Sequence, residues 1–308
     1  MKIYINDSKE NWICDRLRKE FINFKPQIIT DNILEADIIW LYSNWIWQQI
    51  PPQILSSKKV ITTIHHITPS KLNLNDFLFR DQFIDKYHVT CKKTIENFPK
   101  EIDRNKIFYV PYWYNKDLWY EYSTSDKNKF KEQLKLPKNK FIIGSFQRDT
   151  EGSDLISPKL CKGPDIFCDI VENLDFKPHI LLTGLRRQYI ISRLKKAGIG
   201  YTYHEMVNFR DLNRLYNCLD LYLVTSRFEG GPQSVLECSS NKTNILSTNV
   251  GIADIVLSPE CILNTKEDFI EKINTKSFNT KEDNFNNIKQ YSMDIIIPQY
   301  IDHIVKCL

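Results

Sequence analysis

The feature that most constrains this chain is the alternation of short apolar segments with longer helical patterns. FIIGSF, HILLTG and LYLVTS have the composition of buried strands, and PDIFCDIVENL, RRQYIISRLKKAG and NFRDLNRLYNCLD lie between them with the spacing of amphipathic helices. Strands that alternate with helices form parallel sheets, because each crossover helix returns the chain to the same end of the sheet. The sequence therefore predicts an α/β fold.

The same alternation occurs in the first part of the chain, in KIYI, ADIIWLYS, VITTIHHI, KYHVT and KIFYV. All nine glycines lie between Gly144 and Gly251, whereas all six tryptophans lie before them. A chain of 308 residues is long enough for two domains. We therefore expect an N-terminal domain over residues 1–122 and a second domain over residues 123–289. An amphipathic closing helix at about residues 290–308 would pack back on the first domain.

The composition excludes several classes of protein. Hydrophobic residues make up 42% and charged residues 26%, which is typical of a soluble globular protein. The net charge of +4 is too small to predict a nucleic-acid partner, although it leaves peripheral membrane association open. The longest apolar runs are shorter than a membrane span, and the N-terminus lacks the apolar stretch of a signal peptide. The eight cysteines form no CxxC pair, so we expect reduced thiols and a cytoplasmic location.

The stretch SRFEGGPQSVLEC places two acids, Glu229 and Glu237, on either side of a Gly-Gly-Pro. It follows the strand LYLVTS, and strand-to-helix turns of open α/β sheets lie at the ligand-binding edge. Gly230 and Gly231 allow the backbone to approach a ligand closely. Pro232 suits the first helical position, where its missing N–H costs nothing. This pattern predicts a ligand-binding turn.

The start of the following helix is the second part of this prediction. The backbone N–H groups of Gln233, Ser234 and Val235 would be free to bind an anion at the positive end of the helix. Glu229 in the loop and Glu237 inside the helix would contact different parts of one extended ligand, because carboxylates accept hydrogen bonds from paired hydroxyls. An ordinary helix start, with Glu229 as a capping acid and Glu237 on a solvated face, explains the spacing equally well.

The neighbouring sequence resembles a known family. YNCLDLYLVTSRFEGGPQSVLECSSNKTNILSTNVGIADIV resembles the donor-binding core of the retaining glycosyltransferases of family 4, which have the GT-B fold. IIGSFQRDTEGSDLISPKLCKGPDIF is similar to the family's strand followed by Gly, Arg and Lys-Gly, and VITTIHHITP to its first-domain Thr-x-His segment. The resemblance is strong over about residues 138–256 and weaker but collinear before them. It implies two Rossmann-like, doubly wound domains that face a cleft, with the acceptor side on residues 1–122 and the nucleotide-sugar donor site on residues 123–289.

The resemblance implies a role for each matching residue. Glu229 would hold hydroxyls of the donor sugar, the amides of residues 230–233 would approach that sugar and the diphosphate, and Glu237 would bind the ribose hydroxyls. Arg148 and Lys162 would neutralise the diphosphate and stabilise the leaving group as its charge develops. No Asp-x-Asp motif occurs in the chain. The resemblance therefore implies transfer without a metal ion or other cofactor.

Two weaker assignments complete the expected site. His65 aligns with the family's histidine, which would touch the reacting sugar, although a lone histidine more often forms a structural hydrogen bond. Val207 lies where the family packs the nucleotide base, and a loop valine is usually only a packing residue. The first domain departs from the family: IYINDSKENW contains no glycine, and Tyr112-Trp113 stands where Asn-Gly is usual. These departures leave the acceptor side open.

The function that the resemblance implies is transfer of a hexose, with retention of anomeric configuration, from a nucleoside diphosphate sugar to an acceptor hydroxyl. The acceptor would belong to a glycan, a lipid or a protein. Two alternatives use the same fold: a non-catalytic protein that binds nucleotide sugars or glycans, and an epimerase of sugar nucleotides. The sequence identifies neither the base nor the sugar of the donor.

Overall fold

The chain divides into two compact units. A computed structural model describes residues 1–10 and 12–307. Unit 1 consists of Met1–Trp113 together with Met293–Leu308, and unit 2 consists of Tyr114–Ser292. The expected boundary between residues 122 and 123 lies inside unit 2. Each unit has its own parallel sheet and its own hydrophobic core.

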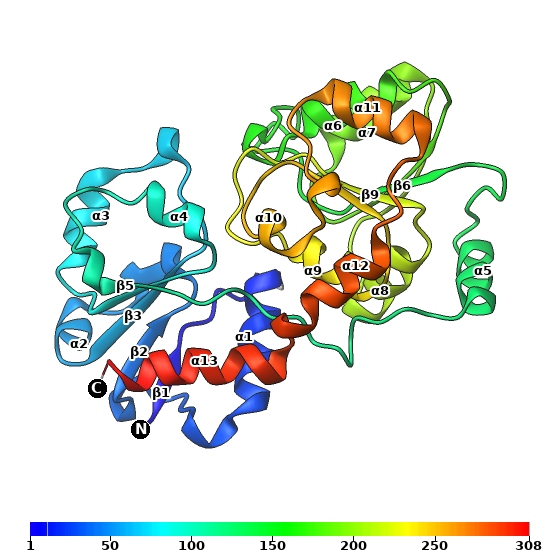
Figure 1. Cartoon of the computed structure of the whole chain (residues 1–308). Coiled ribbons are helices and arrows are strands. Elements are labelled where there is room, and N and C mark those ends of the chain that lie inside the picture. Colours follow the sequence, from blue (N-terminus) through cyan, green and yellow to red (C-terminus); the bar gives the residue numbers. More distant parts are fainter. Residues whose placement is uncertain (11, 308) are drawn as a thin grey trace. The chain divides into compact units, whose positions relative to one another are not determined.

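In the described part of unit 1, the sheet has five parallel strands in the order β1-β2-β3-β4-β5. The strands are β1 (Ile3–Ile5), β2 (Ile38–Leu41), β3 (Lys59–Ile64), β4 (Lys86–Val89) and β5 (Ile107–Tyr109). The helices are α1 (Ile13–Phe24), α2 (Pro52–Ser56), α3 (Leu74–Asp81), α4 (Lys92–Glu96) and α13 (Met293–Val305) (Figure 1).

Unit 1 is doubly wound, because the order in which its strands are added to the sheet reverses once, after the first helix. Ile29, which follows α1, pairs in parallel with Ile3 on one side of β1. The chain then crosses to β2 on the other side of β1 and continues outward from there. Since parallel crossovers are right-handed, this reversal puts helices on both faces of the sheet.

The alternation of side chains along β2 shows the two faces. Ile39 and Leu41 contribute to a core that also contains Leu55 of α2 and Phe77 of α3. Trp40 points the other way, and its ring lies 5.0 Å from that of Phe21 in α1 and 5.6 Å from that of Tyr300 in α13. The closing helix thus packs on the first unit, with Pro298 in its interior rather than near its start.

A buried polar chain crosses the α13 face of this sheet. The indole Nε1 of Trp40 donates to Thr63 Oγ1 over 2.9 Å, and Thr63 Oγ1 lies 3.1 Å from Nδ1 of His88. Nε2 of His88 lies 2.8 Å from the carbonyl oxygen of Val110, which accepts the proton of this nitrogen. Burial lowers the pKa of His88 from 6.5 to about 3, so the folded chain holds this imidazole neutral.

This burial predicts that unit 1 loses stability as the pH falls. Between pH 6.5 and 3 the unfolded chain binds a proton at His88 that the folded chain excludes. The contribution of the neutral His88 to the free energy of unfolding is therefore complete above pH 6.5 and is lost as the pH falls from 6.5 towards 3. We expect the free energy of unfolding to fall by about 2 kcal/mol between pH 7 and pH 5 from this residue. Urea titrations followed by tryptophan fluorescence measure it, because Trp119 is the one tryptophan outside unit 1. An equal pH dependence in the His88→Gln variant would contradict the assignment.

Unit 2, all of whose residues are described, has a five-stranded parallel sheet in the order β10-β9-β6-β7-β8. The strands are β6 (Ile142–Ser145), β7 (His179–Thr183), β8 (Gly200–His204), β9 (Leu221–Val224) and β10 (Ile245–Ser247). The helices are α5 (Thr124–Gln133), α6 (Pro164–Glu172), α7 (Gln188–Ala197), α8 (Phe209–Asn217), α9 (Gln233–Ser240), α10 (Ala253–Val256), α11 (Lys266–Thr275) and α12 (Lys281–Ile288).

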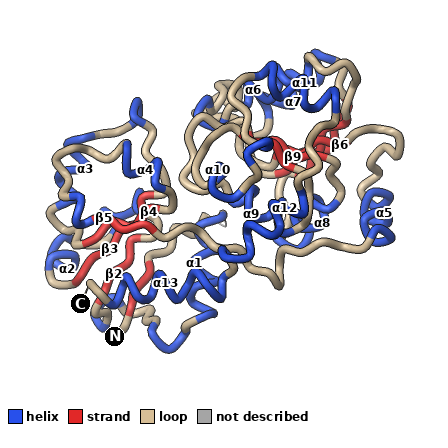
Figure 2. The backbone as a smooth tube through the Cα atoms, viewed as in Figure 1, coloured by secondary structure: helices blue, strands red, loops and turns tan. Residues whose placement is uncertain are grey.

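The winding of unit 2 also reverses once. The chain runs from β6 through β7 to β8 on one side and then returns to β9 on the other side of β6. Accordingly α6, α7 and α11 cover one face of the sheet, while α8, α9 and α12 cover the other (Figures 1 and 2). In a doubly wound sheet the crevice at such a reversal, at the carboxyl ends of the strands, is the usual ligand site.

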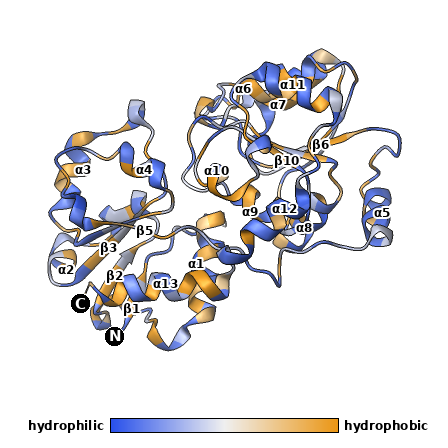
Figure 3. Cartoon of the chain, viewed as in Figure 1, coloured by the Kyte–Doolittle hydropathy of each residue, from blue (hydrophilic) through white to orange (hydrophobic). Residues whose placement is uncertain are grey.

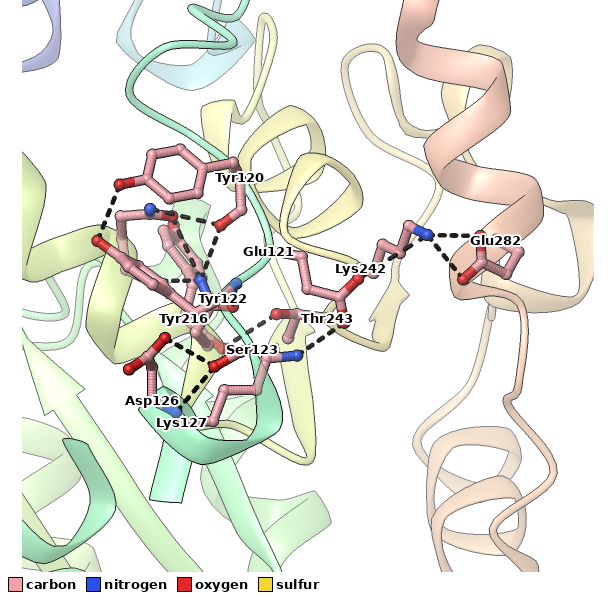
Figure 4. Close-up of polar contacts among 12 residues, drawn as sticks. Tyr120, Glu121, Tyr122, Ser123, Asp126, Lys127, Tyr216, Lys242, Thr243 and Glu282 are labelled. Carbon is pink, nitrogen blue, oxygen red and sulfur yellow. Dashed lines mark hydrogen bonds and ion pairs between the residues drawn. The ribbon is translucent and has the colours of Figure 1, made fainter. Parts of the chain in front are cut away.

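The segment that precedes α5 belongs to unit 2 because polar contacts fix it there. The side chain of Asn217 in α8 accepts a hydrogen bond from the backbone N–H of Tyr122 and donates one to the carbonyl of Tyr120 (2.9 and 3.1 Å). Glu121 lies between Lys127 and Lys242, and Lys242 in turn pairs with Glu282 of α12 (Figure 4). These contacts attach residues 120–122 to unit 2, which begins at Tyr114.

The distribution of apolar residues follows this architecture. Apolar side chains concentrate in the strands and on the sheet-facing sides of the helices, whereas α5 is largely hydrophilic (Figure 3) and buries no residue. Among the residues that the structure describes, no helix is long and apolar enough to cross a membrane.

Candidate functional site

The candidate site forms where the winding of unit 2 reverses. β6 ends at Ser145 and leads into Gln147 and Arg148, and the neighbouring strand β9 ends at Val224 and leads into the loop with Glu229. Because the two strands pair in parallel, both loops leave the sheet at the same edge. The topology therefore brings the predicted Arg148 and Glu229 segments to one edge, although 80 residues separate them in the sequence.

Gly163 makes the closest contact between the loop before α6 and the end of β9. It has a left-handed backbone with φ of 61°, and a Cβ atom there would lie 1.8 Å from the carbonyl oxygen of Thr225. The hydroxyl of Thr225 donates to the carbonyl of Gly163 over 2.8 Å. The backbone N–H groups of Arg227 and Phe228 both donate to the carbonyl of Cys161 (2.9 and 3.1 Å). The Lys-Gly turn and the Glu229 loop are thus joined through their backbones.

This junction brings Lys162 and Glu229 together. Nζ of Lys162 donates to Oε2 of Glu229 over 2.6 Å, and the Ser226 hydroxyl donates to Oε1 over 2.9 Å. The two charged side chains are only 18% and 10% exposed. The side-chain amide of Gln147 donates to the carbonyl of Lys162 over 2.9 Å, so β6 also supports this turn. An ionised carboxylate accepts about four hydrogen bonds, so one such group can bind several donors at once.

A second ion pair links the same two loops on their outer side. Arg227 donates to both carboxylate oxygens of Asp165 at 2.8 and 2.6 Å, and also to the carbonyl of Leu160 at 2.8 Å. Burial tends to raise the pKa of Asp165, but its hydrogen bonds and ion pair with Arg227 outweigh this effect and lower it. Bidentate pairs of this kind fix orientation as well as distance. The arginine beside the Glu229 loop thus has a structural role.

The loop after β6 depends on a fully buried ion pair that the sequence did not reveal. Nε of Arg187 donates to Oδ2 of Asp149 over 3.0 Å, and the guanidinium also donates to the carbonyls of Ser145 and Thr183. Burial raises the pKa of Asp149, and the charge of Arg187 opposes this shift. Next to this pair, half-buried Arg148 donates from Nε to the carbonyl of Thr150 over 2.9 Å. Removal of one member of such a pair leaves an uncompensated buried charge.

The start of α9 differs from the sequence prediction by one residue. Pro232 precedes the helix with an extended backbone, and the helix begins at Gln233. The N–H of Val235 donates to the carbonyl of Pro232 over 2.9 Å, so the prediction that this amide would be free to bind an anion was wrong. Gly251 lies against this turn, since a Cβ atom on it would be 2.7 Å from Cδ of Pro232 and 3.0 Å from the carbonyl oxygen of Gly230.

Glu237 is buried inside α9 and bound to a tyrosine. It is 3% exposed, and the hydroxyl of Tyr216 in α8 donates to its Oε2 over 2.7 Å. Burial, and next the Glu237 charge, raise the pKa of Tyr216 well above 10. The ring of Phe146, just after β6, packs 4.9 Å from the Tyr216 ring. The alternative that placed Glu237 on a solvated face is therefore wrong. No sequence pattern indicated Tyr216, because α8 and α9 contact each other only in the tertiary structure.

The structure also places Val207, Gly231 and Ser234, which the sequence predicted for the donor site. Half-buried Val207 lies in the loop between β8 and α8. Ser234 lies in the first turn of α9 and binds the Tyr222 side chain. Gly231, half-buried, lies between Gly230 and the start of α9. In the described part of the chain, no group of three or more His, Cys, Asp or Glu side chains lies close enough to hold a metal ion.

His65 lies in unit 1, directly after β3, and both of its ring nitrogens have partners. Nε2 lies 2.7 Å from the carbonyl of Tyr42, and Nδ1 contacts the hydroxyl of Tyr112. Since the carbonyl only accepts, Nε2 carries the proton and Nδ1 accepts from the tyrosine. Burial lowers the pKa of His65 to about 4. The ring of Trp45 also packs against His65, with the ring centres 5.8 Å apart.

Comparison with known proteins agrees with this geometry. Residues 156–276 match the family described as Glycosyl transferases group 1. The structure of Anabaena Alr3699/HepE in complex with UDP and glucose has a TM-score of 0.80 at 15% identity and covers 100% of both chains. The fold is GT-B. Sucrose-phosphate synthase from Thermosynechococcus elongatus shares this fold, with a TM-score of 0.69 and 14% identity over 98% of this chain and 80% of that one. WaaG, a glycosyltransferase involved in lipopolysaccharide biosynthesis, also shares it, with a TM-score of 0.65 and 13% identity over 99% of both chains.

These matches confirm the fold that the sequence predicted. Two α/β units with parallel sheets are found, as the GT-B fold requires. The family match begins inside the loop between Arg148 and Lys162, and it includes Lys162, Glu229 and Glu237. No curated protein matches the sequence significantly.

The contact between Gly163 and Thr225 predicts a large cost for a single added methyl group. Gly163→Ala should destabilise unit 2 by about 3 kcal/mol or more, because the strained left-handed backbone adds to a clash with a carbonyl. Gly198→Ala is the matched control: Gly198 has φ of 64°, and a Cβ atom there would meet only Nζ of Lys177 at 3.5 Å. It should cost about 1 kcal/mol. Guanidinium titrations of both variants measure the difference in the free energy of unfolding. Equal losses of stability would show that Gly163 and Thr225 are not in close contact.

Proposed function

We propose that this protein is a retaining glycosyltransferase that moves a hexose from a nucleoside diphosphate sugar to an acceptor hydroxyl. The observation that supports it most is the Lys162–Glu229 pair, held between two backbone-linked loops at the point where the donor-domain sheet reverses. This arrangement offers a cation for phosphate and a carboxylate for sugar hydroxyls within 2.6 Å of each other. Neighbouring groups of this kind suit the junction between a sugar and a diphosphate.

The proposed chemistry uses these residues in separate roles. Glu229 accepts hydrogen bonds from donor-sugar hydroxyls, and the backbone of Gly230 and Gly231 approaches the sugar and the diphosphate. The acceptor oxygen bonds to the anomeric carbon as the bond from that carbon to the diphosphate oxygen breaks. The acceptor proton passes to the leaving phosphate oxygen on the same face, which retains the configuration. Arg148 and Lys162 stabilise the charge that develops on the diphosphate, so the reaction needs no metal ion.

The ribose would bind at Glu237. The Tyr216 hydroxyl donates to Oε2, which fixes the orientation of the buried carboxylate that would accept the ribose hydroxyls. Gln233 and Ser234 in the first turn of α9 would lie between ribose and diphosphate, and Val207 would contact the base. UDP-sugars are the first donors to test, since the HepE structures contain UDP, glucose and UDP-glucose. The acceptor would be a glycan, lipid or protein hydroxyl in the cytoplasm, and peripheral association with a membrane stays open.

The decisive experiment is a transfer assay with site variants. A thermal-shift screen of UDP-, GDP- and ADP-sugars first identifies the donor. Glu229→Ala and Lys162→Ala should then lower the rate of transfer or donor hydrolysis by about 100-fold or more, because each removes a charge from the reacting centre. Lys195→Ala, an exposed change on α7, is the control and should retain full activity. Wild-type activity in either site variant would refute the assignment.

The product distinguishes the alternatives. NMR of the transferred sugar should show the anomeric configuration of the donor, and inversion would exclude the retaining mechanism. Tight donor binding without turnover on any acceptor or water would indicate a binding protein. Conversion of the donor to an epimer, without release of free sugar, would indicate an epimerase.

A second test concerns the ribose. Glu237→Ala should weaken UDP binding by about 10- to 100-fold, because hydrogen bonds to a charged group are worth about 1.5–3 kcal/mol. The same variant should bind 2′,3′-dideoxy-UDP as weakly as the wild type does, since that ligand lacks both hydroxyls. Tyr216→Phe should weaken UDP binding less, because it removes only the group that orients Glu237. Calorimetry with both nucleotides measures these affinities. If Glu237→Ala lost the same affinity for 2′,3′-dideoxy-UDP as for UDP, the ribose would bind elsewhere.

A further inference from the structure

Lys159 lies in the loop between Arg148 and Lys162, and backbone contacts fix its place. Its N–H donates to the carbonyl of Asp149 over 2.8 Å, and its own carbonyl accepts from the N–H of Lys162, also over 2.8 Å. Asp149 is in turn anchored by the buried ion pair with Arg187. Lys159 is therefore as firmly positioned as the two cations that the sequence predicted, although it was not among the predicted residues.

Lys159 is half-buried but has no acidic partner. Among residues 1–10 and 12–307, no carboxylate oxygen lies within the 4.0 Å ion-pair distance of its ammonium group. Lys162, Arg187 and Arg227, the neighbouring cations, each pair with a carboxylate. Asp154 in the same loop binds its own neighbours, because it accepts hydrogen bonds from the Ser157 hydroxyl and from the backbone N–H groups of Ile156 and Ser157. A partly buried lysine without a counter-ion is costly unless an anion reaches it.

The charges around Lys159 are unbalanced. Burial lowers its pKa, and the charges of Lys162 and Arg148 lower it further, while Cys161 and Glu229 raise it. Such interactions weaken with distance, so the positive groups share one neighbourhood. Among the groups that most affect its charge, Glu229 is the one carboxylate, and Glu229 is already paired with Lys162. An ordinary surface lysine would instead extend its ammonium group away from like charges into water.

We propose that Lys159 is a third cation of the diphosphate site and binds the leaving diphosphate together with Arg148 and Lys162. This inference rests on the proposed function and extends it. The loop between Arg148 and Lys162 would then supply a third side chain, Lys159, that binds the phosphate oxygens. An anion bound among the three side chains offsets their mutual repulsion.

Proton uptake on binding is a specific consequence. An anion next to Lys159 stabilises its charged form, so nucleotide binding raises its affinity for a proton. By linkage, binding must weaken as the pH rises and Lys159 loses its proton in the empty site. The groups that face it and set this balance are Lys162, Arg148, Cys161 and Glu229. An arginine at this position would remain charged throughout.

The test is calorimetry of UDP binding to the full chain at pH 7.5 and pH 9.5, in two buffers of different ionisation enthalpy. Lys159→Met should weaken UDP binding by about 10- to 100-fold at pH 7.5, as expected for loss of a charged hydrogen bond. Lys159→Arg should bind nearly as well as the wild type at pH 7.5 and lose less affinity at pH 9.5. Lys196→Met, which removes the same charge from the exposed end of α7, is the matched control and should bind like the wild type.

The outcomes separate this inference from the proposed function. If Lys159→Met retains its thermal unfolding temperature and binds UDP as Lys196→Met does, Lys159 is not a ligand, and the glycosyltransferase proposal is unaffected. If the wild type binds inorganic diphosphate in a Lys159-dependent way but binds no nucleotide sugar, the cation site stands and the proposed function fails. If neither UDP nor inorganic diphosphate binds, both fail.

Discussion

The candidate site depends on the contact between Gly163 and the carbonyl of Thr225. No side chain fits between these two backbones, because even a Cβ atom would lie 1.8 Å from the oxygen. Close approach lets the carbonyl of Cys161 accept from two N–H groups of the opposite loop. It also sets Lys162 2.6 Å from Glu229. The glycine thus acts through the backbone: its absence of a side chain allows the two charged side chains next to it to meet.

Around this contact, two ion pairs hold the loops, and we propose that a third faces the ligand. Arg187 with Asp149 and Arg227 with Asp165 each use several hydrogen bonds and fix backbone segments. Lys162 with Glu229 is partly exposed. The structural arginines thus hold the loops that carry the cations of the proposed site. Tyr216 does the same for Glu237, because its hydroxyl satisfies one oxygen of a buried carboxylate.

Local sequence was a good guide wherever one segment contained the whole pattern. The strand-helix alternation predicted the parallel sheets, and the motif around Glu229 predicted a turn at the carboxyl edge of a strand. It was less reliable at the helix start, where Pro232 precedes the helix and Val235 bonds to its carbonyl. A motif shows which residue types are present but not which backbone groups satisfy one another.

By itself the sequence determined the two-domain α/β architecture and the segments that carry the Arg148, Lys162, Glu229 and Glu237 side chains, because periodicity and motif spacing are local properties. Only the tertiary structure decided that Asp149 pairs with Arg187, that Tyr216 binds Glu237, and that no carboxylate of the described residues pairs with Lys159. These relations join residues from different strands and helices. They arise from the reversal of strand order between β6 and β9, which no single stretch of sequence encodes.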